Sequence, residues 1–505
     1  MLWFGSKGSR KMVEARTSEI NSPTGAQSVW RWARDTPTAI AVIEAGYQYT
    51  YANVAELIVR MVALLRSFDV APGTIVGIEC SSRYLHLVLI LACECLGAAT
   101  VSLAATELNG ENEVLGRCGL LCLEADPGLI AASPAVLRLT GDLLMAIARS
   151  PVTADDFRCL DFQPLPEAPG RIVKSSGTTG RPKLMCNSSI GIRRGIEMTK
   201  SIYDGLNANY NFIAIYQFSF RPTYTDSLLA LRYGGKVLYS TIAGFRADLS
   251  VIGNCHTVVL PLDAMALCAA FRPFGRPDTE CVVVINGGAS SARLHQELLD
   301  TVACRLCVTY STNETNYIAL VDENGVGPLL AGAEVKILGE AFQEVARGES
   351  GLIAVRSIRM VSGYLWDDAL TARHFVGNWH RTSDFGYLRP DGQLVVLGRA
   401  DDMLNIGGVK VPPHPIEAEI SAMPDVGEAV LLGIENTRGV YELHLVVERP
   451  DPIEDIDVHR RIRRAIHQSG RDFVTHYVDC LPRTETGKIM RGALRRMIER
   501  PTEPK

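Results

Sequence analysis

The stretch Ser175-Ser176-Gly177-Thr178-Thr179-Gly180-Arg181-Pro182-Lys183 carries the strongest signal in this sequence. Gly177 and Gly180 tolerate positive φ, so successive backbone N–H groups can converge on an anion, while the hydroxyls add donors and Lys183 adds charge. The apolar lead-in Arg171-Ile172-Val173 predicts a strand that runs into this loop. The stretch therefore predicts a loop that binds polyphosphate.

The composition of this loop does not by itself fix its role. A P-loop has a Gly, four further residues and then Gly-Lys-Ser or Gly-Lys-Thr, whereas Gly180 is followed by Arg181 here. Ser, Thr and Gly are also the ordinary composition of a surface loop. Five further motifs follow in order: Gly287-Gly288-Ala289, Tyr310-Ser311-Thr312-Asn313-Glu314, Arg381-Thr382-Ser383-Asp384, Gly398-Arg399-Ala400-Asp401-Asp402 and Pro482-Arg483-Thr484-Glu485-Thr486-Gly487-Lys488.

In this order and spacing the motifs resemble those of the acyl-adenylate-forming superfamily, which includes acid–CoA ligases, carrier-protein adenylation domains and firefly luciferase. The resemblance runs from about Ser28 to about Arg496 and so covers nearly the whole chain. It implies that a carboxylate attacks the α-phosphorus of ATP, that pyrophosphate leaves, and that the acyl group then passes from AMP to a thiol.

The length and the alternation of elements predict a multidomain α/β protein. A chain of 505 residues exceeds the usual limit for one hydrophobic core. Helical and strand patterns alternate over residues 50–104 and 212–309, which predicts βαβ units around parallel sheets, and short strands with Gly-bearing turns after Glu334 predict a small antiparallel subdomain. With the resemblance, we expect a large N-terminal domain of two doubly wound sheets plus a small β-barrel-like subdomain, and a small mobile α+β C-terminal domain.

The expected domain boundaries follow the motifs. Residues 1–27 form an N-terminal extension, residues 28–398 the domain that binds ATP and the acid, residues 399–402 a hinge that includes Asp401, and residues 403–505 the mobile domain. Strands at Ala429 to Gly433 and Leu443 to Glu448 and a helix at Asp457 to Ser469 predict a compact α/β unit of common domain size.

Composition excludes several classes of protein. The chain is 47% apolar and 21% charged, which is typical of a soluble globular protein. Lys and Arg number 51 against 56 Asp and Glu, a net charge of −5 that gives no electrostatic reason for a nucleic-acid partner. The apolar run from Leu87 to Cys93 is too short to span a membrane, and the N-terminus lacks the apolar core of a secretory signal. We therefore expect a cytoplasmic protein.

The resemblance assigns catalytic roles to Lys488, Thr178 and Glu314. Lys488 would lie between the attacking carboxylate and the α-phosphate, and its loss would cost about 3 to 4 kcal/mol of transition-state stabilisation. Without the other motifs it would be an ordinary exposed lysine on a turn. Glu314 would hold Mg²⁺, which prefers hard oxygen ligands, against the ATP phosphates.

The resemblance also implies how the nucleoside is held. Tyr310 would stack on adenine beside the small residues at 287–289, Asp384 would accept hydrogen bonds from the ribose hydroxyls, and Arg399 would donate to the same sugar. Taken singly, an Asp after Thr-Ser is a common cap and a Tyr after a strand is commonly core. The implied ATP- and AMP-binding set is Ser175, Ser176, Gly177, Thr178, Thr179, Gly180, Lys183, Gly287, Gly288, Ala289, Tyr310, Ser311, Asn313, Asp384 and Arg399.

The second half-reaction would use rotation about Asp401. The loop with Gly407, Gly408 and Lys410 would then line a channel for the thiol of coenzyme A or of a carrier protein, although the same glycines also suit a simple β-turn. The Arg-rich segment at 460–464 either docks such an acidic partner or is a solvated helix face.

The acid pocket is predicted around Phe218, Arg221 and Tyr224. Arg221 falls near the position where amino-acid-activating members of the superfamily carry an Asp that pairs with the substrate ammonium, and an arginine would repel that group. We therefore expect an acid that is not an α-amino acid and that carries a second acidic or carbonyl group for bidentate contact with Arg221. The alternative is an Arg221 exposed on a solvated loop.

The segment Pro482 to Arg491 resembles the acid–CoA ligase branch and favours an AMP-forming acid–CoA ligase with ATP, Mg²⁺ and coenzyme A. Two alternatives remain: a standalone ligase that loads a carrier protein or another acceptor, and a non-catalytic nucleotide-binding paralogue. The presence of Glu314, Asp384 and Lys488 argues against the latter. Lys174, Ser311, Asn313 and Ser383 depart from the usual pattern without removing a charge that the chemistry needs.

Overall fold

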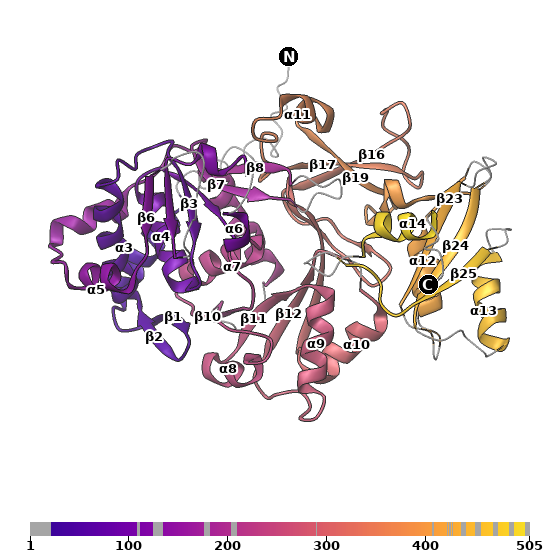
Figure 1. Cartoon of the computed structure of the whole chain (residues 1–505), viewed down its shortest axis with the longest axis horizontal. Helices are drawn as coiled ribbons and strands as arrows, with labels where there is room; N and C mark the ends of the chain where they lie inside the picture. The colour runs from indigo at the N-terminus through magenta and orange to yellow at the C-terminus, as the bar shows by residue number, and fades with distance from the viewer. Residues whose placement is uncertain are drawn as a thin grey trace, which may run out of the picture.

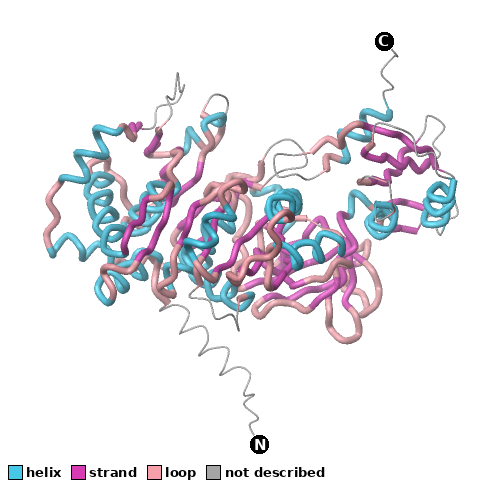
Figure 2. Tube along the Cα trace, turned by 90° about the horizontal axis from the view of Figure 1, so that it is seen from below, coloured by secondary structure: helices cyan, strands magenta, loops and turns pink. Residues whose placement is uncertain are grey.

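The computed structural model describes residues 22–108, 112–124, 135–175, 182–203, 210–288, 290–406, 409–421, 423, 426, 428–435, 441–449, 456–467, 473–483 and 489–499. Within these ranges the chain is a mixed α/β protein with a large N-terminal part and a smaller C-terminal lobe beside it (Figures 1 and 2). The predicted fold class is confirmed.

Two largely parallel sheets form most of the N-terminal part. The first has the order β14 (Asn316–Leu320), β13 (Arg305–Thr312), β12 (Cys281–Asn286), β11 (Cys255–Val259), β9 (Phe212–Ala214), β10 (Val237–Tyr239), β1 (Ile40–Glu44) and β2 (Tyr47–Thr50). Its inner pairs are parallel and its two edge pairs antiparallel. The second has the order β6 (Ala135–Arg138), β5 (Leu120–Leu123), β3 (Ile75–Glu79), β4 (Ala99–Ser102), β7 (Pro169–Lys174) and β8 (Leu184–Ser188).

Helices cover these sheets and fill the space between them. They are α2 (Gly25–Asp35), α3 (Tyr51–Arg66), α4 (Arg83–Cys95), α5 (Gly141–Arg149), α6 (Ser189–Ile202), α7 (Arg221–Arg232), α8 (Phe245–Ile252), α9 (Pro261–Phe271) and α10 (Ala292–Thr301). Thr50 caps α3 in a capping box with Asn53, and Ser188 caps α6, so local sequence fixes where both helices begin. Because α6 packs on α7 and on β7, β8 and β14, these two helices join the two sheets.

A third, antiparallel sheet follows, as predicted after Glu334. It contains β15 (Val326–Gly327), β20 (Leu394–Arg399), β19 (Trp379–Leu388), β17 (Gly351–Ser357) and β16 (Ala333–Leu338), with β18 (Phe375–Val376) paired to β19 and α11 (Asp368–His374) before it. A turn between β19 and β20 ends at Gly392, whose φ of 89° suits glycine. This sheet presents the residues of β19 and β20 to the end of β13.

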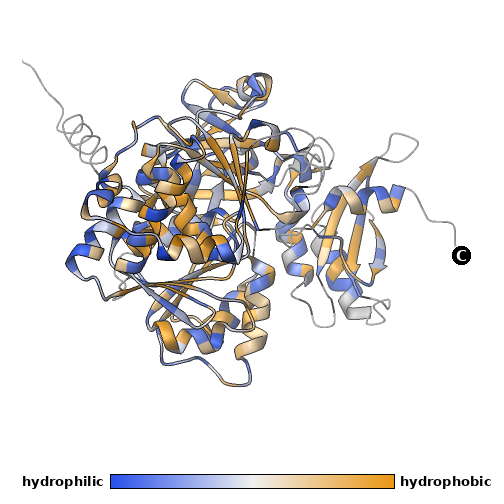
Figure 3. Ribbon diagram, turned by 60° about the vertical axis from the view of Figure 1, so that its left-hand side comes forward, coloured by the Kyte–Doolittle hydropathy of each residue, from blue (hydrophilic) through white to orange (hydrophobic). Residues whose placement is uncertain are grey.

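The C-terminal lobe has its own apolar cores, and its strands are largely hydrophobic (Figure 3). It contains η4 (Ala400–Asp402), β21 (Leu404–Ile406), β22 (Val409–Val411), α12 (Pro413–Ser421), β23 (Ala429–Glu435), β24 (Tyr441–Glu448), α13 (Ile456–His467), β25 (Phe473–Val478) and α14 (Arg491–Glu499). The β23–β24 pair is antiparallel and the β24–β25 pair parallel. The expected strands and helix of this lobe are present; its mobility and the boundaries at 399 and 403 stay predictions. Over the part of the chain that the structure describes, no helix is both long and apolar enough to cross a membrane.

Candidate active site

The predicted phosphate loop connects β7 to β8, so the strand expected before it is confirmed. The backbone N–H of Ser175 donates to the carbonyl of Lys183 at 2.9 Å, and the backbone N–H of Lys183 donates to Oγ of Ser175 at 3.3 Å. These bonds close the neck of the loop. Residues 176–181, which include Ser176, Gly177, Thr178, Thr179 and Gly180, lie outside the described residues.

Three of the residues assigned to the nucleoside meet where β13, β19 and β20 come together. The Tyr310 hydroxyl donates to Oδ2 of Asp384 at 2.7 Å, and Nη1 of Arg399 lies 3.5 Å from Oδ1 of the same carboxylate. Asp384 and Arg399 are direct neighbours in the β19–β20 register. The structure thus brings together a ring, a carboxylate and a cation from three strands, which is the set that can hold a base and a ribose.

Two glycines follow the end of β12, beside the Tyr310, Asp384 and Arg399 side chains. Gly287 has a φ of 90°, and a Cβ there would lie only 3.0 Å from a Leu260 methyl group. Gly288 follows without a side chain, while Ser311 in β13 hydrogen-bonds Asn286 at 2.7 Å. Leu260 and Pro261 thus lie close to Gly287 and Gly288, and the contact of this segment with adenine stays a prediction; Ala289 lies outside the described residues.

Glu314 lies in a compact polar cluster that also contains Tyr364, His380 and Lys183. The Tyr364 hydroxyl donates to Oε1 of Glu314 at 2.8 Å, and Nε2 of His380 lies 3.9 Å from the same oxygen. The Lys183 ammonium lies 5.2 Å from the centre of the Tyr364 ring. One end of the phosphate loop is thereby placed beside the carboxylate that was assigned to magnesium.

The Glu314 carboxyl is ionised at neutral pH although it is buried. Burial opposes ionisation, but the attraction of His380, the Tyr364 hydroxyl and Lys183 outweighs it and lowers the pKa of Glu314. Burial also lowers the pKa of His380 to about 4, so the imidazole is neutral at neutral pH, where the Tyr364 hydroxyl and Lys183 are the groups that still favour the carboxylate. At neutral pH the cluster holds one buried negative charge that faces a phenol, a neutral imidazole and a lysine.

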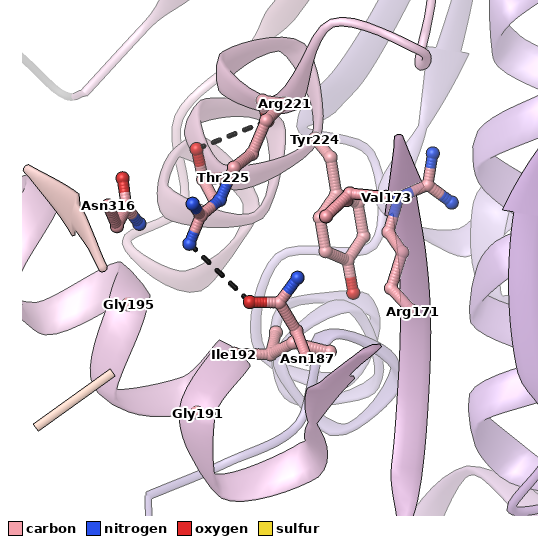
Figure 4. Close-up of a pocket in the computed structure, with 10 residues that line it drawn as sticks. All are labelled: Arg171, Val173, Asn187, Gly191, Ile192, Gly195, Arg221, Tyr224, Thr225 and Asn316. Atoms are coloured by element: carbon pink, nitrogen blue, oxygen red, sulfur yellow. Dashed lines mark hydrogen bonds between the residues drawn. The ribbon is translucent and has the colours of Figure 1, made fainter. Parts of the chain in front are cut away.

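Arg221 is not on a solvated loop, so that alternative is wrong. It begins α7, and its Nη1 donates to the carbonyls of Asn313 at 2.8 Å and Thr312 at 3.4 Å. Its Nη2 lies 3.4 Å from Oδ1 of Asn187 (Figure 4). Burial lowers its pKa to about 10, so the guanidinium keeps its charge at neutral pH.

The three residues assigned to the acid pocket separate in the structure. Arg221 and Tyr224 both line a cavity between α6, α7 and β7. Phe218 does not line it: its ring is buried and stacks on His86 with ring centres 4.9 Å apart. Tyr224, one turn into α7, supplies the aromatic wall instead.

The hinge region is tied to the last helix of the C-terminal lobe. Asp401 is exposed in η4, whereas Oδ2 of Asp402 lies 3.6 Å from Nε of Arg491, which also makes a bidentate pair with Glu417 at 2.6 and 2.7 Å. Lys410 lies in β22. Gly407, Gly408 and Lys488 lie outside the described residues.

The Arg-rich segment forms part of α13. Ile462 is buried, whereas the arginines at 460, 461, 463 and 464 are exposed, which fits a solvated helix face.

Sequence reasoning missed several residues that the tertiary structure brings to these sites. Tyr364 and His380 were not singled out, although the alternation of β19 places His380 on the same buried face as Thr382 and Asp384. In the sequence, Arg171 indicates only the strand that precedes the loop. Asn187 and Asn316 are among the other cavity residues that sequence reasoning missed.

The fold is that of adenylate-forming enzymes. An amide bond synthetase from Marinactinospora thermotolerans superposes with a TM-score of 0.79 over 94% of this chain and 99% of that chain, at 21% sequence identity. The chain belongs to the AMP-binding enzyme family, whose sequence profile matches residues 29–114 and 147–365.

Curated relatives resemble the chain over most of its length. The 2-succinylbenzoate–CoA ligase of Bacillus licheniformis is 25% identical over 477 residues, which cover 91% of this chain and 97% of that ligase. A plipastatin synthase of Bacillus subtilis is 25% identical over 530 residues, which cover 97% of this chain but only 14% of that much longer protein. The two relatives thus differ in kind, one being a CoA ligase and the other a subunit of a plipastatin synthase.

Proposed function

We propose that this chain is an AMP-forming ligase that activates a carboxylic acid with ATP and then transfers the acyl group to the thiol of coenzyme A. The observation that carries the proposal is a pair of carboxylates with different neighbours. Asp384 lies beside Tyr310 and Arg399, and the ionised Glu314 lies beside Lys183. The first suits a nucleoside and the second suits charged phosphates.

Within this proposal the chain's own residues orient ATP. Tyr310 would lie against the base, and Asp384 would turn its oxygens to the ribose hydroxyls, because both oxygens lie at the strand junction next to Tyr310 and Arg399. Lys183 would contribute positive charge at the phosphates.

The residues around Glu314 fit a magnesium ion. A buried carboxylate whose pKa is lowered and whose close partners are a phenol and a neutral imidazole leaves a negative charge that a divalent cation would balance. When bound, Mg²⁺ would neutralise phosphate charge as pyrophosphate leaves. Glu314 would hold the ion, and Tyr364 would orient Glu314 through its hydroxyl.

Lys488 and the hinge at Asp401 complete the proposed cycle. Lys488 would stabilise charge between the carboxylate and the α-phosphate in the first step. Rotation about Asp401 would then bring residues 407–410 to the nucleotide for thiol attack, and the acyl-adenylate needs no enzymic nucleophile because it is already activated.

A second acceptor class has specific support. One structural neighbour is an amide bond synthetase, and one curated relative is part of a plipastatin synthase. An amine or a carrier protein is therefore the alternative acceptor. A nucleotide-binding protein without catalysis is the remaining alternative.

Pyrophosphate release tests the proposal. The purified chain with MgATP and a panel of acids should release pyrophosphate only when a suitable acid is present, and Asp384→Asn should lower that rate at least tenfold. Adding coenzyme A, a holo carrier protein or simple amines should then release AMP with one acceptor. Acid-independent nucleotide binding with no pyrophosphate from any acid would leave the non-catalytic alternative.

A further inference from the structure

A small cavity lies between the two sheets, at the junction of α6, α7 and the β7–β8 hairpin. Its empty volume is about 270 Å³, including space open to solvent, and its lining comprises Arg171, Val173, Asn187, Gly191, Ile192, Gly195, Arg221, Tyr224, Thr225 and Asn316. Two of these ten residues are arginines and none is acidic. The side chains that line the cavity therefore carry a net positive charge, which a negatively charged ligand would offset.

Arg171 is the more deeply buried of the two cations, with 2% of its surface exposed. Its Nη atoms donate to Oγ1 of Thr100, Oγ of Ser102 and the carbonyl of Phe218, at 3.1, 2.6 and 2.7 Å. Its Nε has no hydrogen-bond partner among the described residues, and its guanidinium lies 4.8 Å from the centre of the Tyr224 ring. Burial lowers the pKa of Arg171 to about 10, so a full positive charge is held here by neutral groups.

Arg221 stands on the other side of Tyr224 and is also held by neutral acceptors (Figure 4). Asn316 adds a further donor: it is 5% exposed, lies beside Arg221 in Figure 4, and its Nδ2 has no hydrogen-bond partner within the part of the chain that is described. Buried donors and charges without an acceptor are costly, so each of these groups would gain from an oxygen anion in the cavity.

The nearest carboxylates do not fill this need, because each is engaged elsewhere. Asp226 accepts from Tyr203 at 2.7 Å and lies 3.2 Å from His256. Glu94 accepts from the backbone of Ala26 at 2.9 Å and lines a neighbouring cavity beyond Tyr224. Glu314 is in the cluster described above.

We propose that this cavity binds a second carboxylate of the substrate, so that the acid activated by this chain is a short dicarboxylic acid. The inference rests on the proposed function and narrows its substrate class. A carboxylate can accept bidentate hydrogen bonds from Arg221 and a further bond from Asn316, and it supplies the missing negative charge. A neutral carbonyl would supply acceptors but would add no negative charge beside the two arginines, of which only Arg221 is attracted by Glu314.

The position of the cavity limits the length of the acid. Arg221 donates to the carbonyl of Asn313, the residue directly before Glu314, so the cavity adjoins the segment that carries the proposed magnesium ligand. Because the two places adjoin, the expected acid has a short chain between its carboxylates, as in malonate and succinate.

A variant that supplies its own negative charge to Arg221 tests the proposal most directly. Asn187→Asp keeps the side-chain size and places a carboxylate 3.4 Å from Nη2 of Arg221, where it would replace the substrate's negative charge. Gly191→Ala keeps the charges but adds a methyl group at the cavity wall, where the nearest atom is Oγ of Ser188 at 3.3 Å. Gln48→Glu, an exposed change on β2 at the far edge of the other sheet, is the matched charge control.

The test uses binding and turnover of the full chain. Thermal shifts and calorimetry with malonate, succinate, acetate, propionate and pyruvate report binding, and pyrophosphate release with MgATP reports kcat/KM. We expect a dicarboxylate to exceed its monocarboxylate analogue at least tenfold in kcat/KM. Asn187→Asp should remove that preference without lowering the Tm of the ligand-free protein, Gly191→Ala should weaken succinate more than malonate, and Gln48→Glu should match wild type.

Two failures are distinguishable. If no acid supports pyrophosphate release, the proposed function fails, but dicarboxylate-specific stabilisation of wild type and its loss in Asn187→Asp would still support the cavity as an anion site. Equal binding and turnover of acetate or propionate would overturn the inference, as would pyruvate matching malonate, since a neutral carbonyl would then suffice. An unchanged dicarboxylate preference in both Asn187→Asp and Gly191→Ala would overturn it as well.

Discussion

Replacing Glu314 by Gln separates a role in holding magnesium from a role in holding the fold. The amide has the same size as the carboxyl, and its oxygen can still accept the Tyr364 hydroxyl that donates at 2.8 Å. The change therefore removes a charge and little else. Because the pKa of Glu314 is lowered, that charge is present at neutral pH in the native protein.

The two effects of this substitution have different expected sizes. The bond from Tyr364 changes from a charge-assisted to a neutral one, a loss of about 1 kcal/mol, and the relief of a buried charge offsets part of it. Stability should therefore fall by about 1 kcal/mol or less. Loss of the ion's charged protein ligand should lower the affinity for MgATP about 100-fold, equivalent to about 2.7 kcal/mol.

Calorimetric titration with ATP measures this prediction without knowledge of the acid. Wild type should bind ATP much more tightly with Mg²⁺ than with a chelator, whereas Glu314→Gln should lose most of that difference and keep its Tm within a few degrees. Glu349→Gln, the same change at an exposed position, is the control. The reasoning is refuted if Glu314→Gln binds MgATP within threefold of wild type, or if its affinity falls equally with and without magnesium.

Three further predictions concern the C-terminal lobe and the N-terminal core. Lys488→Ala should lower pyrophosphate release about 100- to 1000-fold while synthetic acyl-adenylate is still consumed with the acceptor, and equal loss of both steps would contradict the assignment. Arg491→Gln removes the partner of Asp402 and of the buried Glu417, so hydrogen exchange in the C-terminal lobe should show a loss of about 3 kcal/mol, and unchanged protection there would contradict it. Burial, with a further contribution from Arg171, holds the pKa of His86 well below 6.5. The stabilising contribution of the neutral imidazole is therefore present above about pH 6.5 and is lost as the pH falls. The Tm of His86→Leu should decline less than that of wild type between about pH 7.5 and about pH 5, and parallel declines would count against this prediction.

Local patterns predicted the elements of this fold well because each depends on neighbours in the sequence. The alternation of apolar runs located β3, β4 and β12, and the glycine-rich motif after β7 predicted a loop on a strand. The short strands with Gly-bearing turns after Glu334 predicted the antiparallel sheet. The cap is equally local: Thr50 fixes the first turn of α3 through its bond to the backbone of Asn53.

Pairings between distant segments were beyond those patterns. The Tyr310–Asp384 hydrogen bond joins residues 74 apart, and the Tyr364–Glu314 bond joins residues 50 apart. Neither partner's identity reveals the other, because the contact depends on how the antiparallel sheet docks against the end of β13. His380 illustrates the same point: only the strand geometry of β19 shows that it faces Glu314.

The sequence by itself determined the family, the α/β fold class and the residue types of the candidate site, because motifs and hydrophobic periodicity are written in short stretches of chain. Tertiary structure alone decided that Arg221 is enclosed rather than solvated, that Phe218 packs in the core, and that Arg171 shares a cavity with Arg221. The physical reason is that burial and the balance of charge around a group are set by every segment packed against it, and those segments are distant in the chain.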